Sequence, residues 1–170
     1  MDGAWENLTD AEMDLAWDRF RTEFIFRPSV RPQDWPGIKE PAPSTTYSIS
    51  SVYGKDYYVL ETDLNAKVLK AFQKCIEQEK RLYALDWQHP CYWLYAHHFV
   101  DSQRSEAWMV PVLPNGDYYI FLAEDFSFGL FGHPWEKTIC VFGKVLLSAL
   151  AQDMPLLFTK PIRRDGKAAV

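Results

Sequence analysis

The stretch PVLPNGDYYIFLAEDFSFGLFGHPW, residues 111–135, decides the fold. The pair Asn115-Gly116 stands between two apolar runs, and both central residues of a tight hairpin turn need positive φ, so the pair predicts a hairpin of strands 108–113 and 117–123. Both faces of the second strand are apolar, with Tyr118, Ile120 and Leu122 on one and Tyr119, Phe121 and Ala123 on the other. This pattern predicts a central strand that is covered on both sides.

Further strands are predicted on both sides of this stretch. Glu124 and Asp125 form the next turn, residues 126–131 return as a strand, residues 132–135 turn again, and residues 138–142 form another strand. Two strands, or one strand broken at Pro90, are predicted over residues 82–89 and 92–97. A short hairpin is predicted over residues 45–49 and 56–61, and a last short strand over residues 156–159. The expected fold class is α+β, a largely antiparallel sheet of about five to seven strands with two to three helices packed mainly on one face.

Three helices are predicted, over residues 10–23, 64–80 and 144–152. Thr9 and Glu12 have the spacing of a capping box, and Leu8 and Met13 that of a hydrophobic staple. Each helix has an apolar inner face, formed by Met13, Trp17, Phe20 and Phe24 in the first, by Leu64, Val68, Ala71, Phe72, Cys75 and Ile76 in the second, and by Val145, Leu146, Ala149 and Leu150 in the third.

The length of 170 residues fits one domain with a single core. Residues 27–44 contain five prolines, which disfavour helix and predict an extended strap that wraps around the body and is pinned by Trp35 and Ile38. Residues 102–106 are polar and predict a loop. Residues 1–8 and 163–170 are predicted to be mobile ends, with Arg163 and Arg164 in solvent.

The charge and the cysteines exclude several classes of protein. A formal net charge of -5 argues against binding to nucleic acid or to an anionic membrane. The cysteines are Cys75, Cys91 and Cys140, too widely spaced for a Cys-x-x-Cys pair, so reduced thiols in the cytoplasm are expected. We see neither a signal peptide in the first residues nor an apolar run of membrane-spanning length.

The sequence offers no catalytic or metal-binding constellation of useful spacing. The histidines are His89, His97, His98 and His133, and none forms a His-x-His or Glu-x-x-His pattern. Cys91 lies near His89 but Pro90 separates them, and no Gly-x-Ser-x-Gly elbow occurs. Glu124 and Asp125 form a carboxylate pair, although a turn also needs such residues. No cofactor and no metal are expected.

Two segments combine tryptophan, histidine and proline at a predicted strand end: Trp87 to Pro90 and Gly132 to Trp135. Both residue types have an apolar body and a polar tip, which suits recognition at a rim. The alternative is that each histidine bonds a nearby carbonyl and each tryptophan caps the core. The candidate binding residues are Trp87, His89, Glu124, Asp125, His133 and Trp135.

Several motifs together resemble one bacterial family: Trp17-Asp-Arg-Phe20, Trp35-Pro36, Leu85-Asp-Trp-Gln-His89, the run from Asn115 to Asp125, Phe131-Gly-His-Pro-Trp135 and Cys140-Val-Phe-Gly143. The chain is similar to domain of unknown function family 2716 from about residue 5 to residue 161. The resemblance implies a soluble bacterial cytosolic protein and carries no established activity. More loosely, the chain looks like toxin immunity proteins and like small antitoxin-like domains related to a yeast cell-wall regulator.

Two functional hypotheses follow. The first is a non-enzymatic protein-binding module, an immunity-type inhibitor with a basic protein partner, because the charge is acidic and no catalytic constellation occurs. The second is a small-molecule-binding protein or enzyme with a pocket between the two Trp/His motifs. The chain is expected to be a monomer or a homodimer that pairs through a sheet edge.

Overall fold

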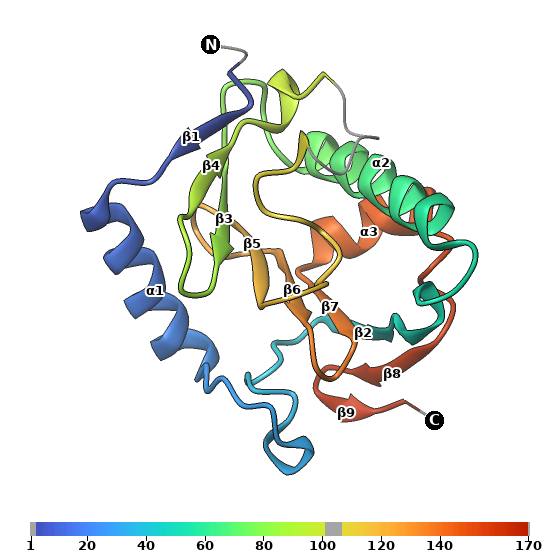
Figure 1. Ribbon diagram of the computed structural model, residues 1–170. Helices are drawn as coiled ribbons and strands as arrows, with labels where there is room; N and C mark the ends of the chain where they lie inside the picture. Colours follow the sequence, from blue (N-terminus) through green and yellow to red (C-terminus); the bar gives the residue numbers. More distant parts are fainter. Residues whose placement is uncertain (1–2, 101–106, 170) are drawn as a thin grey trace.

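The computed structural model describes residues 3–100 and 107–169, and within them one antiparallel sheet organises the chain (Figure 1). Its nine strands run in the order β1-β4-β3-β5-β6-β7-β2-β8-β9. The strands are β1 Trp5–Asn7, β2 Ser44–Ser48, β3 Leu82–Asp86, β4 Tyr92–Leu94, β5 Tyr119–Ala123, β6 Gly129–His133, β7 Thr138–Phe142, β8 Pro161–Arg164 and β9 Lys167–Ala168. The α+β class and the antiparallel sheet are confirmed, but the prediction of five to seven strands is wrong because both ends of the chain add strands.

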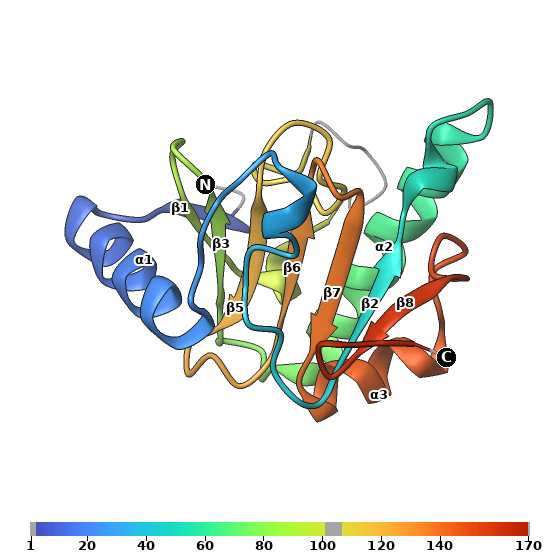
Figure 2. The same ribbon diagram turned by 90° about the horizontal axis from the view of Figure 1, so that it is seen from below.

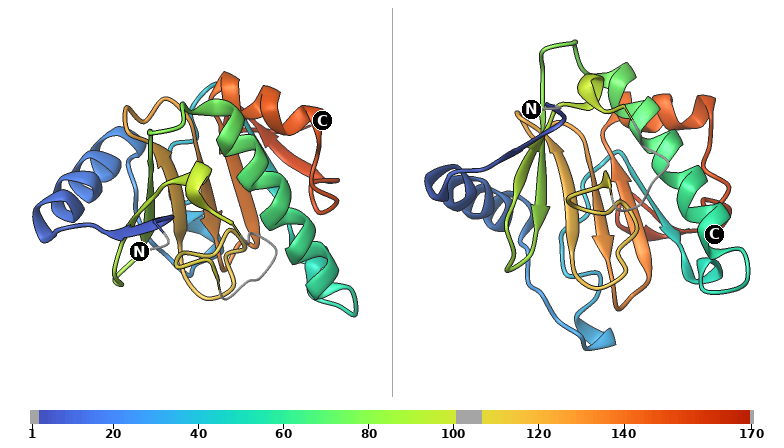
Figure 3. Two further views of the ribbon diagram at one scale, coloured as in Figure 1. Left: turned by 90° about the horizontal axis from the view of Figure 1, so that it is seen from above. Right: turned by 45° about the horizontal axis from the view of Figure 1, so that its top comes forward.

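Helices cover both faces of the sheet. The three α-helices are α1 Asp10–Phe24, α2 Tyr57–Cys75 and α3 Lys144–Gln152, and short 3-10 turns occur at η1 Pro32–Asp34, η2 Ser50–Val52 and η3 Ala96–His98. Figure 2 shows α1 on one side of the sheet and α2 and α3 on the other, and Figure 3 shows α2 and α3 side by side. The capping box of Thr9 and Glu12 is confirmed at the start of α1.

Strand β5 lies in the middle of this structure, as the alternation of its residues predicts. Phe121 faces α2, where its ring lies 5.5 Å from that of Phe72. Ile120 and Leu122 face α1 and join the cluster of Phe20, and both faces of the strand are buried. The central, doubly covered strand is therefore confirmed.

The hairpin predicted across Asn115-Gly116 is wrong. Strand β5 pairs with β3 on one side and β6 on the other, so neither edge is left for residues 108–113. That segment forms no strand; it buries Val110, Val112 and Leu113 in the core on the α2 side of the sheet. Its prolines also lack the N–H that a ladder needs.

The hairpin predicted for residues 45–49 and 56–61 is also wrong. Strand β2 pairs with β7 and β8, and Tyr57 is already the first residue of α2. This helix starts earlier than predicted, because Leu64 and Val68 continue one buried face from Glu61, and it ends at Cys75. In α3, Val145 is 53% exposed rather than buried, and residues 156–159 form turns instead of a strand.

Both ends of the described chain form strands, whereas the sequence predicts mobile segments there. Strand β1 pairs with β4, and Trp5 contacts the rings of Tyr92, Phe99 and Trp108. Strands β8 and β9 extend the sheet beyond β2 as far as Ala168. Acidic partners hold Arg163 inside the protein, which is why this part of the chain is not a solvated tail. The loop predicted at residues 102–106 lies outside the described residues.

The proline-rich strap, residues 27–44, crosses the α1 side of the sheet between α1 and β2 (Figure 2). Two backbone hydrogen bonds close a loop in the strap. The Arg27 N–H donates to the Gly37 carbonyl at 2.8 Å, and the Lys39 N–H donates to the Phe24 carbonyl at 2.7 Å. Ile38 is buried and Trp35 is half-buried. The strap thus packs against Tyr118 and His133, at the end of the sheet that holds four of the six predicted site residues.

Candidate functional site

Four of the six predicted site residues lie at one end of the sheet, which we call the upper rim. There β3 ends at Asp86, β5 begins at Tyr119, and β6 ends at His133 (Figure 2). Trp87 and His89 follow β3, and His133 and Trp135 belong to the β6–β7 turn region. Glu124 and Asp125 lie at the opposite end, in the turn between β5 and β6. The structure therefore divides the predicted set into two separate places.

Tyr118 is the point on which the two Trp/His motifs converge. Its ring centroid lies 5.7 Å from that of Trp87, 4.9 Å from His133 and 5.2 Å from Trp135. The phenol is fully buried, and its hydroxyl donates to the Ser29 carbonyl at 3.2 Å and accepts from the Ser29 N–H at 3.0 Å. The space between the motifs is thus occupied by Tyr118, where the second hypothesis expected a pocket.

His133 is a buried neutral imidazole. Its Nδ1 accepts the Glu136 N–H at 3.0 Å, its ring meets that of Trp35 at 5.4 Å, and its Nε2 has no partner among the described residues. Burial lowers the pKa of His133 to about 4, because the charged form would lose its hydration. Since Nδ1 accepts, Nε2 carries the proton, and His133 has the environment of a packing residue.

A buried charge network that the sequence reasoning missed lies behind His133. Arg163 donates from Nη1 and Nη2 to the two oxygens of Glu136 at 2.7 and 2.9 Å, and from Nε to Glu40 at 3.0 Å. Burial would raise the pKa of Glu136, but the hydrogen bonds and charge of Arg163 hold it below its ordinary value. The network fastens the strap, the β6–β7 turn and β8 to one another. No local pattern marks it, because its three residues come from distant segments.

His89 forms a second polar cluster, with Asp86 and Asp117. Its Nδ1 lies 2.9 Å from Oδ1 of Asp86 and 3.5 Å from Oδ2 of Asp117. The hydrogen bond and charge of Asp86 raise the pKa of His89, and burial raises the pKa of Asp86 against the opposing effect of His89. The register of β3 and β5, which pairs Asp86 with Tyr119, brings the two carboxylates together. The sequence does not show this pairing, so Asp86 and Asp117 were not expected as site residues.

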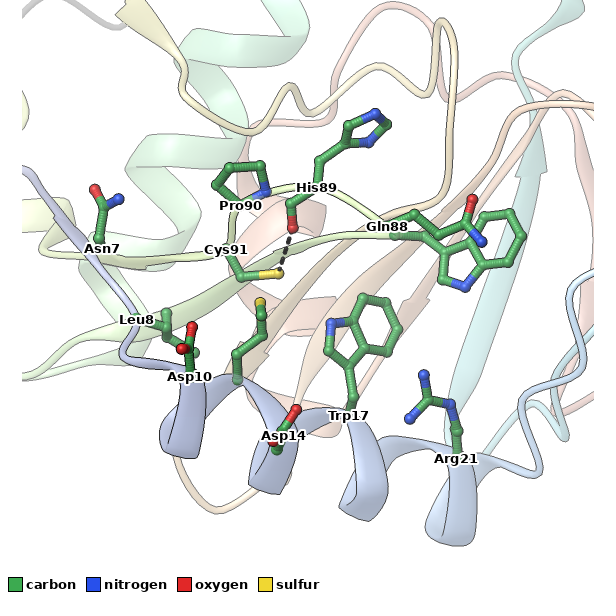
Figure 4. Close-up of a pocket in the computed structure, with 12 residues that line it drawn as sticks. Asn7, Leu8, Asp10, Asp14, Trp17, Arg21, Gln88, His89, Pro90 and Cys91 are labelled. Carbon is green, nitrogen blue, oxygen red and sulfur yellow. Dashed lines mark hydrogen bonds between the residues drawn. The ribbon is translucent and has the colours of Figure 1, made fainter.

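A cleft of about 640 Å³, which we call the α1 cleft, separates α1 from the β3–β4 turn (Figure 4). Figure 4 shows Asp10, Asp14, Trp17 and Arg21 projecting from α1 toward that turn. The lining residues are Asn7, Leu8, Asp10, Met13, Asp14, Trp17, Arg21, Trp87, Gln88, His89, Pro90 and Cys91. The cleft thus includes the first Trp/His motif and has α1 as its other wall.

Cys91 lies in this cleft, but its environment does not suit a nucleophile. Its side chain is buried, and Sγ lies 3.5 Å from the carbonyl oxygens of Asp86 and His89. Burial raises the pKa of the Cys91 thiol, so the thiolate form is disfavoured.

At the opposite end of the sheet, Glu124 and Asp125 serve the turn. The Asp125 carboxylate accepts the Ser127 N–H at 3.0 Å and the Ser127 hydroxyl at 2.6 Å. Arg19 of α1 donates to the carbonyls of Glu124 and Asp125 at 3.2 and 2.9 Å. Both side chains also line a second cleft of about 450 Å³, beside Cys75 and Arg81. The contacts of Asp125 are those of the turn interpretation, whereas the Glu124 carboxylate lies 3.7 Å from the Arg81 guanidinium.

The other histidines do not join a common site. His97 bonds the Ile76 carbonyl at 2.9 Å, and His98 bonds the Gly3 carbonyl at 3.3 Å. Among the described residues, the one group of three or more metal-ligating side chains close enough to share an ion is Asp86, His89 and Asp117. A search of the described helices finds none with the length and hydropathy of a membrane span.

Comparisons with known proteins agree with the family resemblance. A family profile described as "Protein of unknown function (DUF2716)" matches residues 7–147. The chain is 37% identical over 159 residues to "Uncharacterized protein YxiI" of Bacillus subtilis (strain 168), covering 91% of this chain and 96% of that protein. No solved structure matches the chain significantly.

Proposed function

Because the chain belongs to the DUF2716 family, whose function is unknown, we propose a function from its own geometry: it is a non-enzymatic binding module, an immunity-type inhibitor that holds a basic segment of a toxin in the α1 cleft. One observation carries the proposal. Asp10 and Asp14, two exposed carboxylates that form no ion pair among the described residues, line a cleft whose wall includes Trp17.

The charge of the cleft favours a cationic occupant. Asp10 and Asp14 are exposed, and neither has an ion pair within residues 3–100 and 107–169. The cleft lining contains one arginine, Arg21. Its Nη1 lies 3.5 Å from Oδ1 of Asp18, a residue that does not line the cleft. A net charge of -5 on the whole chain adds attraction for a basic partner at long range.

The aromatic side chains supply the apolar part of such an interface. Trp17 is largely buried in the wall of the cleft, Trp87 is half-buried at its edge, and Trp135 is 37% exposed on the same rim. Lysine and arginine side chains bind well over indole rings, and Arg21 already lies 5.6 Å above the ring of Trp17. Tryptophan is also one of the residue types enriched in binding hot spots.

The contacts of the remaining candidates favour binding over catalysis. The Cys91 thiol is buried with a raised pKa, and the His133 imidazole is buried and neutral with its Nδ1 already bonded to backbone. A hydrolase or transferase that used either group would need it to reach a substrate. Both side chains instead pack against neighbours.

The test is affinity capture of partner proteins from the native cell, with matched charge variants, and the expected partner is a basic toxin. Asp10→Asn with Asp14→Asn removes two negative charges from the cleft, and Glu77→Gln with Glu79→Gln removes two from exposed positions after α2. We expect the cleft variant to bind roughly tenfold more weakly, the control variant to bind like the wild type, and binding to weaken in high salt.

Neutralisation of the toxin in cells is the second readout. Co-production of the chain should restore growth of cells that make the toxin, and the cleft variant should restore it less than the control variant. Equal binding and equal protection by both variants would refute the cleft as the binding site. Capture of a small cationic molecule in the same cleft, without a protein, would instead favour the small-molecule hypothesis, since the volume also suits such a ligand.

A further inference from the structure

The upper rim holds a cluster of three potential metal ligands, one of which, His89, also lines the α1 cleft. Asp86 ends β3, His89 stands in the β3–β4 turn, and Asp117 precedes β5, the strand that pairs with β3. One ligand atom of each lies within 4.8 Å of the other two. We propose that Asp86, His89 and Asp117 form a binding site for a divalent transition-metal ion of the Zn²⁺ type.

The fold brings two partly buried carboxylates together at this cluster. The side chains of Asp86 and Asp117 are only 17% and 15% exposed, and both approach the same ring nitrogen. No lysine or arginine of the described chain forms an ion pair with either carboxylate. Two partly buried like charges repel each other, so the pair favours a cation, and a metal ion on the His89 Nδ1 would take the place of the proton that Asp86 favours there. A divalent ion at this place would neutralise both carboxylates.

The cluster offers one imidazole nitrogen and two carboxylate oxygens as ligands. An imidazole nitrogen with two carboxylate oxygens suits borderline metals such as Zn²⁺, whereas Mg²⁺ and Ca²⁺ prefer oxygen alone. Ligand atoms about 2.0–2.2 Å from Zn²⁺ are separated by roughly 3.3–3.5 Å in a tetrahedron. The Nδ1–Oδ distances of 2.9 and 3.5 Å lie near this range, and all three ligand atoms lie within 4.8 Å of one another, so side-chain rotations would close the triangle.

Neighbouring backbone groups hold the ligand side chains in place, and the cluster is open to solvent at His89. The second oxygen of Asp117 accepts the Tyr118 N–H at 2.8 Å, which fixes the carboxylate from behind. The main chain of Gln88, in the left-handed region at φ 64, turns His89 back toward Asp86, and the His89 N–H donates to the Asp86 carbonyl at 3.3 Å. The His89 side chain is 57% exposed, so an ion can enter from solvent and keep water in its remaining positions.

The binding assay uses the purified chain, without a histidine tag, titrated with Zn²⁺ in a calorimeter, and with Co²⁺ followed by visible absorption. We expect one ion per chain with a micromolar or tighter dissociation constant. His89→Gln and Asp117→Asn should each weaken binding at least about tenfold, because the loss of a residue that merely supports a metal ligand already costs about 10–100-fold. His98→Gln removes an exposed histidine elsewhere and should leave binding unchanged.

The outcome does not depend on the proposed toxin partner, because the assay contains the chain and the metal alone. Circular dichroism without metal verifies that each variant is folded, so that a lost signal reports the site. Binding of equal strength in the wild type, His89→Gln and Asp117→Asn would overturn the proposal. So would the absence of a 1:1 binding event in the folded wild type.

Discussion

Replacement of His133 by asparagine tests whether burial keeps this imidazole neutral. The pKa of His133 is about 4 in the folded protein, because burial disfavours its charged form, against 6.5 for the free side chain. Between these two values the unfolded chain binds a proton that the folded chain does not. Stability therefore rises with pH in this window: the contribution of the neutral imidazole is complete above about pH 6.5 and is lost as the pH falls toward about 4.

The expected magnitude follows from the two pKa values. At pH 5 the unfolded imidazole is mostly charged and the folded one is mostly neutral, and about 1.5 pH units at about 1.4 kcal/mol per unit amount to about 2 kcal/mol. The asparagine side chain can still accept the Glu136 N–H that Nδ1 accepts at 3.0 Å, so the turn keeps this bond. Any cavity left by the smaller side chain weakens the variant equally at both pH values.

The measurement is urea unfolding of the wild type and of His133→Asn at pH 7 and at pH 5. The stability advantage of the wild type over the variant should shrink by about 2 kcal/mol from pH 7 to pH 5. His89, whose pKa is raised by its hydrogen bond to Asp86, shifts stability the opposite way, but it is present in both proteins and cancels. Among the groups that face His133, Arg163 holds the pKa of Glu136 below its ordinary value, outside the window, and Arg163 stays charged.

A parallel pH dependence in the two proteins would refute the reasoning. It would mean that the imidazole can take up a proton without loss, for example through a water molecule at Nε2. His98→Asn is the matched control, because His98 is exposed, and its pH profile should follow the wild type.

Two further predictions concern stability and are measured by chemical denaturation. A Cβ on Gly129 would overlap the Phe121 carbonyl oxygen and lie 2.8 Å from Cζ of Phe142. Gly129→Ala should therefore lower the free energy of unfolding by about 3 kcal/mol or more. The control is Gly54→Ala, which has open space around it and should change that free energy by less than about 0.5 kcal/mol. Arg163→Met leaves Glu40 and Glu136 buried without their cation and should cost about 3–5 kcal/mol, part of which should return when Glu40→Gln and Glu136→Gln are added. A loss no greater than that of a surface substitution would contradict either prediction.

Features that depend on neighbouring residues were predictable from the sequence. The capping box of α1 needs only Thr9 and Glu12, three positions apart, and it forms as predicted. The alternation along β5 requires only that a strand exposes its residues to two faces in turn, and both faces are covered. In each case the physical cause lies within one element.

Features that depend on pairing between distant segments were not predictable. Asn115-Gly116 has the composition of a hairpin turn, but β5 takes β3 and β6 as its neighbours, and the preceding segment is displaced onto the α2 side. Tyr57 and Val59 have high strand propensity, yet they lie in the first turn of a helix whose buried face runs from Glu61 through Leu64 to Val68. Tertiary packing overrides local propensity at both places.

The candidate site shows the same division. Trp87, His89, His133 and Trp135 were recognised because tryptophan and histidine are unusual in turns, and the structure places all four at one end of the sheet. Asp86 and Asp117 were not recognised, since only the β3–β5 register brings them to His89. Arg163 was expected in solvent, because nothing near it in the sequence indicates Glu40 or Glu136.

The buried contacts behind the upper rim bear directly on how this surface would bind a partner. Ser29 of the strap holds the Tyr118 hydroxyl, and the Tyr118 ring packs against Trp87 at the edge of the α1 cleft and against His133. Arg163 then ties the turn after His133 to the strap through Glu136 and Glu40. Trp87 is therefore positioned by three distant segments before a partner arrives. Pre-organised aromatic anchors lose little conformational entropy on binding, so the polar network would contribute to affinity without touching the partner.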